Sequence, residues 1–247
     1  DIANKTESVS GSCSPKDFET MMQLTYLTFT APRRDDDAFA SYKNRNKAAL
    51  KNQELNPNVA FSDSIQAGIY MKHPRIIRIK ADMVDQMDYD KILSMYQDRF
   101  KDASDFTFIF VGNVDVEKMK PVIAEYLGAL PAVNRKETFK DNKIEMRQGI
   151  YKNEFTKQQE TPKASVFAFY NGDCKYDLRN NLLLSMTSQI LDLVYTEKVR
   201  EDEGGTYGVY VGGTLQKYPK EKAILQIIFD TAPEKKEKLM KIILQLI

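Results

Sequence analysis

The most informative stretch of the chain is Val199-Arg200-Glu201-Asp202-Glu203-Gly204-Gly205-Thr206-Tyr207-Gly208-Val209-Tyr210. The apolar residues before it are mostly spaced by three or four positions, which is typical of one face of an α-helix; they are Leu183, Met186, Ile190, Leu193 and Val194. Gly204-Gly205 supplies the left-handed backbone that ends helices. Residues 206–215 are rich in Tyr, Val and Thr, which favour strands. The stretch therefore predicts a helix, a tight turn and a strand.

We expect this turn to bring Arg200 and Tyr207 together, with Gly204 and Gly205 as the supporting turn residues. A guanidinium and a phenol are both hydrogen-bond donors, which suits them to a carbonyl oxygen or an oxyanion. A structural interpretation stays open beside this one. An arginine in a last helical turn interacts favourably with the helix dipole, and tyrosine is common in strands.

The composition excludes several classes of protein. At 247 residues the chain is long enough for one large domain or two ordinary ones, and its 42% hydrophobic residues suffice for a core. The net charge is only +1, so no basic surface points to nucleic acid or an anionic membrane. No apolar run approaches the roughly 20 residues that a membrane helix needs. We therefore expect neither a nucleic-acid partner nor a membrane partner.

The two cysteines and the chain ends suggest no chemistry of their own. Cys13 and Cys174 lie far apart in the sequence and form neither a metal-type cluster nor a disulfide framework. The chain starts at Asp1 without a methionine, and it ends at Leu246-Ile247 inside an apolar helical pattern. We expect both ends to be cut points in a longer protein.

Helix start and stop signals recur along the chain. Ser14-Pro15 is typical of a helix start, and Asp88 and Asp115 are typical N-cap residues. Asn56-Pro57 ends one helix and begins the next. With the apolar periodicity, these signals predict helices over residues 14–31, 35–55, 57–70, 88–100, 115–127, 176–200 and 231–246.

The strand signals are shorter. Phe106–Val111 is almost entirely apolar, which predicts a buried strand. Further strands are expected over residues 206–215 and 223–230, and over 149–155 and 164–170 as a hairpin. The polar region that precedes them has no sustained period. It predicts a domain over residues 1–133, a linker over 134–148 and a second domain over 149–247.

Two polar features are weak candidates for metal ligands. His73, the only histidine, precedes Pro74 in a polar loop, where a role in a turn is favoured. Asp35, Asp36 and Asp37 would point in different directions around a helix, so a role at the helix N-terminus is favoured over a metal site.

Two segments share one order of elements, which predicts a partial internal repeat. Val9-Ser10-Gly11, read as the end of a strand, leads through Pro15 into an amphipathic helix, and Ile227-Ile228-Phe229 leads through Pro233 into another. The chain would then hold the back part of one α+β domain and the front part of the next. Chance similarity is the alternative, because a strand followed by a proline-capped helix is common.

Four segments, in order and spread over most of the chain, resemble the pitrilysin/insulinase family of zinc metallopeptidases, the inverzincins. These segments lie within residues 14–33, 61–74, 108–131 and 199–209. The resemblance implies parts of the third and fourth of four related domains, which form the C-terminal half of such a protein. Each domain would be an α/β sandwich of the processing-peptidase type, with antiparallel-rich sheets packed with helices. The expected fold class is α+β.

The resemblance also implies a role for each part. In this family the N-terminal domain holds zinc through His-x-x-Glu-His and a distant Glu, and the C-terminal half closes a chamber over it. An Arg and a Tyr spaced like Arg200 and Tyr207 reach the substrate across that chamber. Tyr207 would donate to the oxyanion or a neighbouring carbonyl, and Arg200 would orient the substrate backbone. An extended peptide would also pair with an exposed sheet edge.

This sequence departs from the family at the zinc site. Such a site needs two histidines on one helix face and a base carboxylate, and the chain has a single histidine. The chain alone should neither hold zinc nor cleave peptides. Its expected partners are a peptide substrate and the N-terminal half of the same polypeptide, which would carry the zinc. A non-catalytic scaffold and a standalone peptide-binding module are the alternatives. The family likeness favours the periplasm or cell envelope over the cytoplasm.

Overall fold

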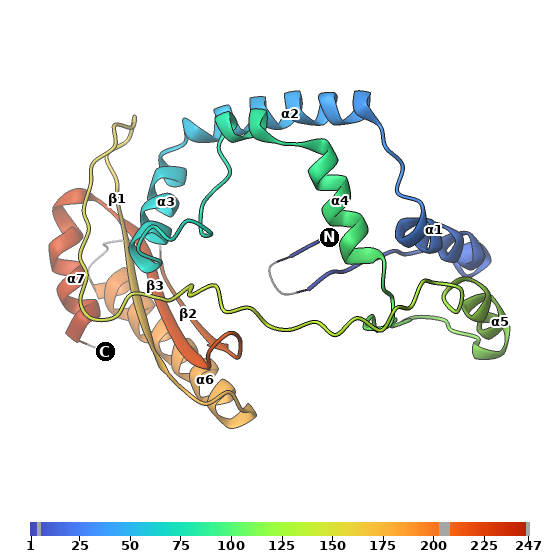
Figure 1. Cartoon of the computed structure of the whole chain (residues 1–247). Coiled ribbons are helices and arrows are strands. Elements are labelled where there is room, and N and C mark those ends of the chain that lie inside the picture. The colour runs from blue at the N-terminus through green and yellow to red at the C-terminus, as the bar shows by residue number, and fades with distance from the viewer. Residues whose placement is uncertain (4–5, 203–207, 246–247) are drawn as a thin grey trace. The chain divides into compact units, whose positions relative to one another are not determined.

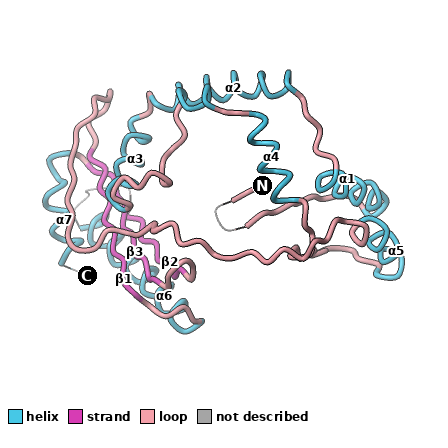
Figure 2. Tube along the Cα trace, in the orientation of Figure 1, coloured by secondary structure: helices cyan, strands magenta, loops and turns pink. Residues whose placement is uncertain are grey.

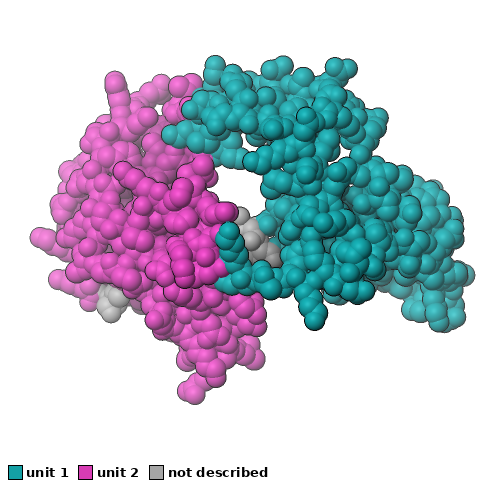
Figure 3. All heavy atoms as spheres, in the orientation of Figure 1, with its two compact units in different colours: residues 1–51, 79–140 teal, residues 52–78, 141–247 magenta. Residues whose placement is uncertain are grey.

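The computed structural model describes residues 1–3, 6–202 and 208–245 of the chain, and for residues 200–202 it describes the backbone alone. The chain forms two compact units (Figure 3). The first unit contains residues 1–51 and 79–140, and the second contains residues 52–78 and 141–247. These units are defined by compactness, whereas the predicted domains are defined by a repeat. The predicted domains 1–133 and 149–247, with the linker 134–148, therefore stay a prediction.

The described part of the first unit is mainly helical (Figure 1). Helix α1 packs against α4 and α5, and the buried side chains of Phe29, Phe100 and Leu130 form its core. The rings of Phe29 and Phe100 meet edge to face with their centroids 5.2 Å apart. The helical elements are η1 (Pro15–Asp17), α1 (Phe18–Thr30), α2 (Asp36–Glu54, whose last residues belong to the second unit), η2 (Ala81–Gln86), α4 (Tyr89–Phe100) and α5 (Val116–Tyr126).

Local capping bonds place the helix starts where the sequence predicted them. The carboxylate of Asp88 accepts from the Lys91 N–H at 3.0 Å, and that of Asp115 accepts from the Lys118 N–H at 3.3 Å. Asn56 caps α3 in the second unit by accepting from the Asn58 N–H at 2.9 Å. Each bond satisfies a backbone donor that the first helical turn leaves free.

The prediction of a buried strand at Phe106–Val111 is wrong. This segment, between α4 and α5, is a loop (Figure 2), and Ile109 and Val111 are 79% and 93% exposed. A strand needs a neighbour to pair its backbone, and no strand longer than an isolated bridge occurs in the described part of this unit. Phe106 instead packs its ring against Phe29, with the centroids 4.9 Å apart. Residues 9–11 likewise form no strand.

The second unit combines helices with an antiparallel sheet, which confirms the predicted α+β fold class. Its strand order is β1-β3-β2, so that β3 lies in the centre and pairs antiparallel with both neighbours. Its elements are α3 (Pro57–Ile69), β1 (Ala164–Asp173), α6 (Leu178–Tyr195), the π-helix η3 (Thr196–Asp202), β2 (Val209–Gln216), β3 (Lys222–Thr231), η4 (Pro233–Lys235) and α7 (Lys236–Gln245).

Alternate residues of the strands form the core with α6 and α7. Ile227 lies between Ala168 and Val211 in the sheet, and Phe229 lies between Val166 and Val209. Because side chains alternate between the faces of a sheet, these residues share one face. The buried residues of this core are Tyr195, Val199, Val209, Val211, Ile227, Phe229, Leu239 and Ile243.

Two expectations about this unit change in the structure. Residues 149–155 form no strand and no hairpin with β1: β1 pairs with β3 instead, and the Asn153 side chain donates to the Ser64 hydroxyl of α3 at 2.7 Å. On α6, the apolar stripe that predicted the helix faces outward, with Met186 and Ile190 both 57% exposed. The buried side of α6 carries Ser188 and Tyr195 instead.

Candidate functional site

The candidate site predicted from the sequence lies in the segment between α6 and β2. The backbone of Arg200 lies in the π-helix η3, at the end of the long helix as predicted. The Arg200 side chain and all of Gly204, Gly205 and Tyr207 lie outside the described residues. The approach of the two side chains to each other therefore stays a prediction. The described site is the frame of the connection between α6 and β2: Tyr195 and Val199 before it, and Val209 and Val211 after it.

The frame before the connection is fixed by two fully buried side chains. Tyr195 and Val199 have no exposed surface, and both belong to the core of the second unit. The Tyr195 hydroxyl donates to the Ile243 carbonyl oxygen of α7 at 3.0 Å. Burial raises the pKa of this phenol, and the neighbouring Tyr170 adds to the shift. The backbone that carries Arg200 thus starts from a point packed between β2, β3 and α7.

The frame after the connection is the first half of β2. Val209 and Val211 are buried and pair with Phe229 and Ile227 of the central strand. The chain from Val199 to Val209 is therefore anchored in the same apolar core at both ends. Asp192 of α6 adds a polar link, because its carboxylate accepts from the Val211 N–H at 3.1 Å. In the sequence, the only signal for Asp192 is an acidic residue among apolar ones near the end of a helix.

The helix that precedes the connection ends in an uncommon geometry. Residues Thr196–Asp202 form a π-helix of seven residues. π-helices are rare, usually span a single turn, and occur frequently at functional sites. Such a turn rotates the following residues relative to a regular α-helix, so it changes the direction in which the Arg200 position leaves the helix.

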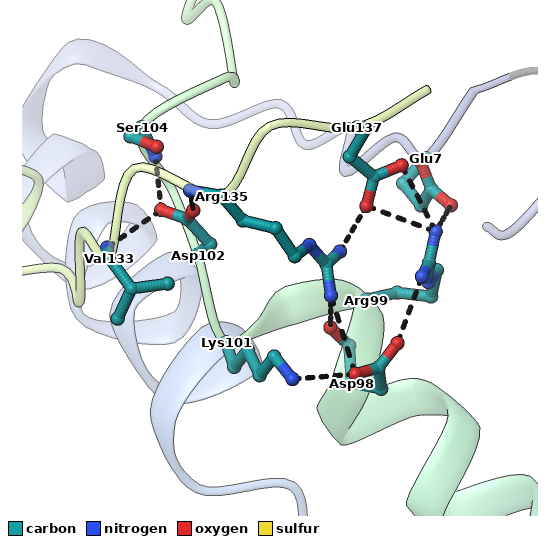
Figure 4. A network of polar contacts seen from close by, with 9 residues as sticks. All are labelled: Glu7, Asp98, Arg99, Lys101, Asp102, Ser104, Val133, Arg135 and Glu137. Atoms are coloured by element: carbon teal, nitrogen blue, oxygen red, sulfur yellow. Dashed lines mark hydrogen bonds and ion pairs between the residues drawn. The ribbon is translucent and has the colours of Figure 1, made fainter. Parts of the chain in front are cut away.

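In the first unit, a cluster of charged side chains joins the end of α4 to the segment around Arg135 (Figure 4); its members include Asp98, Arg99, Asp102 and Arg135. Asp102 is buried and accepts from the backbone N–H groups of Ser104, Val133 and Arg135 at 3.0, 3.0 and 2.6 Å. Hydrogen bonds from the Ser104 side chain and the Arg135 backbone hold the pKa of the Asp102 carboxyl well below its usual range. The cluster ties the segment around Arg135 to the end of α4.

A shallow pocket of about 270 Å³ lies beside α3 in the second unit. Its lining includes Arg147, whose Nε donates to the Gly68 carbonyl at 2.9 Å and whose guanidinium lies over the Tyr151 ring at 4.1 Å. A cation at the C-terminus of a helix is favoured by the helix dipole. This arginine therefore caps α3, and the pocket follows from that packing.

The residues present do not fit a zinc site of the type that the family resemblance implies. The single histidine, His73, lies in a turn as predicted, where its Nδ1 accepts from the Arg75 N–H at 3.2 Å. Asp35 accepts from the Ala38 N–H at 2.8 Å, which is the expected role at a helix start. Across the described ranges no group of three or more His, Cys, Asp or Glu side chains could hold a metal ion.

None of the described helices has both the length and the apolar character that crossing a bilayer requires.

Comparison with known proteins identifies what the chain is similar to. The family model described as the peptidase M16 inactive domain matches residues 86–247. The probable zinc protease PqqL of Haemophilus influenzae is 21% identical over 211 residues, which cover 84% of this chain and 22% of that protein. The chain thus spans about a quarter of the length of such relatives.

Two solved structures share the fold of this chain. The periplasmic protease PqqL from Escherichia coli matches with a TM-score of 0.78 and 22% identity, over 93% of this chain and 25% of that one. The peptidase M16 inactive domain from Pseudomonas fluorescens matches with a TM-score of 0.65 and 20% identity, over 93% of this chain and 55% of that one. Below 25% identity, these likenesses establish the fold.

Proposed function

The chain belongs to the family of the peptidase M16 inactive domain, and we propose that it is part of the non-zinc half of a larger zinc metallopeptidase. In this proposal the chain forms a wall of the chamber in which the parent protein hydrolyses peptide bonds. The observation that carries the proposal is the family match over residues 86–247, because it includes the whole connection from α6 to β2.

The chain's own contribution is to bind and orient the peptide. Tyr207 would donate its hydroxyl hydrogen to the oxyanion, or to a neighbouring carbonyl, and so stabilise the charge that develops during hydrolysis. Arg200 would hold the substrate backbone through charge-assisted hydrogen bonds. The buried residues Val199 and Val209 support this role, since they anchor both ends of the connection that carries the two side chains.

The metal belongs to the other half of the polypeptide in this proposal. The single histidine of this chain, His73, is engaged in a turn, so the N-terminal half would supply all the zinc ligands. That half and the peptide are the two partners that the chain would contact. A periplasmic location is part of the same proposal, because the matching Escherichia coli protease is described as periplasmic.

An extended peptide would also pair with an edge of the sheet in the second unit. In the described sheet β3 is central and β1 and β2 are the outer strands; because the Val211 N–H of β2 is bound by Asp192, we propose β1 as the edge that pairs with the peptide. Pairing with a strand edge binds peptide backbone without reading its sequence, which suits a peptidase that accepts extended substrates of varied sequence.

The test compares the full-length protein that contains this chain with the chain alone. We expect the full-length protein to bind zinc and cleave an unstructured fluorogenic peptide, and a chelator to abolish the cleavage. The isolated chain should show neither activity. A folded full-length protein that binds no zinc and cleaves no peptide would overturn the proposal in favour of a non-catalytic scaffold of the same fold.

A further inference from the structure

Asp192 is the residue at which three elements of the second unit meet. It lies on α6, one turn before the helix ends. Its backbone carbonyl accepts from the Thr196 N–H, a donor that it shares with the Leu193 carbonyl where α6 gives way to the π-helix. Its side-chain Oδ1 accepts from the Val211 N–H of β2 at 3.1 Å. One residue therefore links the end of α6, the start of η3 and the first half of β2.

The bond to Val211 fixes the outer side of an edge strand. Val211 is opposite Ile227 of β3 and its side chain is buried in the core. Among the described strands β2 pairs with β3 alone, and the Val211 N–H donates to the carboxylate of Asp192. β2 is thus held by β3 on one side and by α6 on the other. This sets the position of the strand relative to the helix.

The residues closed by this bond are those that lead to the proposed substrate-binding pair. Arg200 follows Asp192 in the sequence, and Tyr207 precedes Val211. Between Asp192 and Val211, the backbone of Thr196–Asp202 adopts the π-helical geometry that occurs frequently at functional sites. Val199 and Val209 are buried on either side. These apolar contacts resist separation of helix and strand, but a directional hydrogen bond also opposes their sliding past each other.

We infer that Asp192 is a positioning residue for Arg200 and Tyr207, an inference that rests on the proposed function. It would touch neither substrate nor metal. Its carboxylate holds β2 in one register against the end of α6, and so sets the separation of the two points from which the donors start. A misplacement of about 1 Å can cost about 10²-fold in rate, so a bond that fixes this separation affects turnover more than affinity.

The experiment uses Asp177 as a matched control on the same helix. Asp177 caps the other end of α6, where its carboxylate accepts from the Asn180 N–H at 2.8 Å. Each carboxylate therefore accepts one hydrogen bond from a backbone N–H, and that of Asp177 also lies 3.8 Å from the Lys175 ammonium. We would make Asp192→Ala, Asp192→Asn and Asp177→Ala in the full-length protein, alone and combined with Tyr207→Phe. Zinc content, thermal unfolding, kcat and KM for peptide cleavage would be measured for each variant.

We expect Asp192→Ala to lower kcat by about tenfold or more with little change in KM, and Asp192→Asn to restore most of the loss, because the amide oxygen can still accept the bond. Asp177→Ala should lower the melting temperature to a similar extent without this loss of kcat. In the Tyr207→Phe background Asp192→Ala should have much less effect, since residues that act through one another are not additive.

Two results would overturn the inference. One is an equal loss of kcat in Asp192→Ala and Asp177→Ala, which would make Asp192 a purely structural residue. The other is an undiminished effect of Asp192→Ala when Tyr207 is already phenylalanine. Failure of the proposed function is distinguishable from both, because the unmodified full-length protein would then cleave no peptide, or Tyr207→Phe alone would leave kcat unchanged.

Discussion

Leu184 of α6 lies directly over Gly213 of β2, so that a Cβ atom on the glycine would stand 2.9 Å from Leu184 Cγ and 3.1 Å from the Leu184 carbonyl oxygen. The helix approaches the strand so closely here because the glycine has no side chain. The contact lies within the same pair of elements, α6 and β2, that Asp192 links by its hydrogen bond to Val211. Packing and polar bonding together set how this helix lies on the sheet.

Gly213→Ala should therefore destabilise the protein by about 1–3 kcal/mol, the usual cost of adding a methyl group to a well-packed site. Gly172→Ala is the matched control on another strand of the sheet, because a Cβ atom there would meet nothing within 4 Å. Urea unfolding of both variants measures the difference. Equal stability of the two variants would show that α6 can move away from the sheet at no cost.

Asp102 in the first unit predicts an acid-dependent loss of stability. Its pKa is lowered in the folded state by hydrogen bonds from the Ser104 side chain and the Arg135 backbone. A carboxylate of this kind stabilises the fold fully above its unfolded pKa of about 4 and loses that contribution as the pH falls further toward the folded pKa. Asp102→Asn should therefore unfold at a lower temperature than the wild type at pH 7, and the gap should narrow below about pH 4.

The control for that experiment is Asp141→Asn. Asp141 also accepts from a backbone donor, the Lys143 N–H at 2.8 Å, but it does so at the surface. Melting temperatures between pH 7 and pH 3 should show only a small gap for this variant at every pH, because water screens the Lys143 contacts that lower the pKa of this exposed carboxyl. A gap for Asp102→Asn that stays constant over this range would mean that its carboxylate does not carry the stabilisation.

The elements that could be predicted from the sequence are those specified by neighbouring residues. Asn56-Pro57, Asp88 and Asp115 each start a helix with a bond to a residue two or three positions away, so the signal is local. Phe106–Val111 was mispredicted because the apolar pattern of a strand says nothing about a partner. β3 was predicted correctly from a similar pattern, and the structure gives it partners on both sides.

The candidate site likewise contains residues that the local sequence specifies and residues that depend on distant contacts. Arg200 could be selected from its residue type and its place in a last helical turn, together with the family resemblance, and the described backbone places it in that turn. The role of Asp192 depends on a contact with Val211, 19 residues away, which no local pattern specifies. The contribution of the Arg200 side chain and of Tyr207 stays a prediction.

Tyr195 connects the end of α6 to α7, and its hydroxyl bond can be tested by stability. Tyr195→Phe removes the donor to the Ile243 carbonyl and should cost about 1 kcal/mol at pH 7. Because burial raises the pKa of this phenol in the folded state, its contribution is full below the unfolded pKa of about 10 and is lost as the pH rises through the folded value.

Urea unfolding of Tyr195→Phe at pH 7 and above pH 10 tests both statements. The advantage of the wild type should shrink in the alkaline range. Tyr210→Phe is the control, since Tyr210 is 57% exposed and should change stability little at either pH. An advantage of the wild type that persists unchanged above pH 10 would contradict the assigned direction of the shift.

The proposed role of Tyr207 is tested by the smallest change that removes its donor. Tyr207→Phe in the full-length protein should lower kcat for peptide cleavage by about 10² to 10³, the usual cost of losing one hydrogen bond to a developing oxyanion. Zinc content and melting temperature should stay at their wild-type values, because the ring is kept. Tyr210→Phe, three residues along, removes the same group and should leave kcat unchanged. Unchanged cleavage by Tyr207→Phe would refute the role of this hydroxyl.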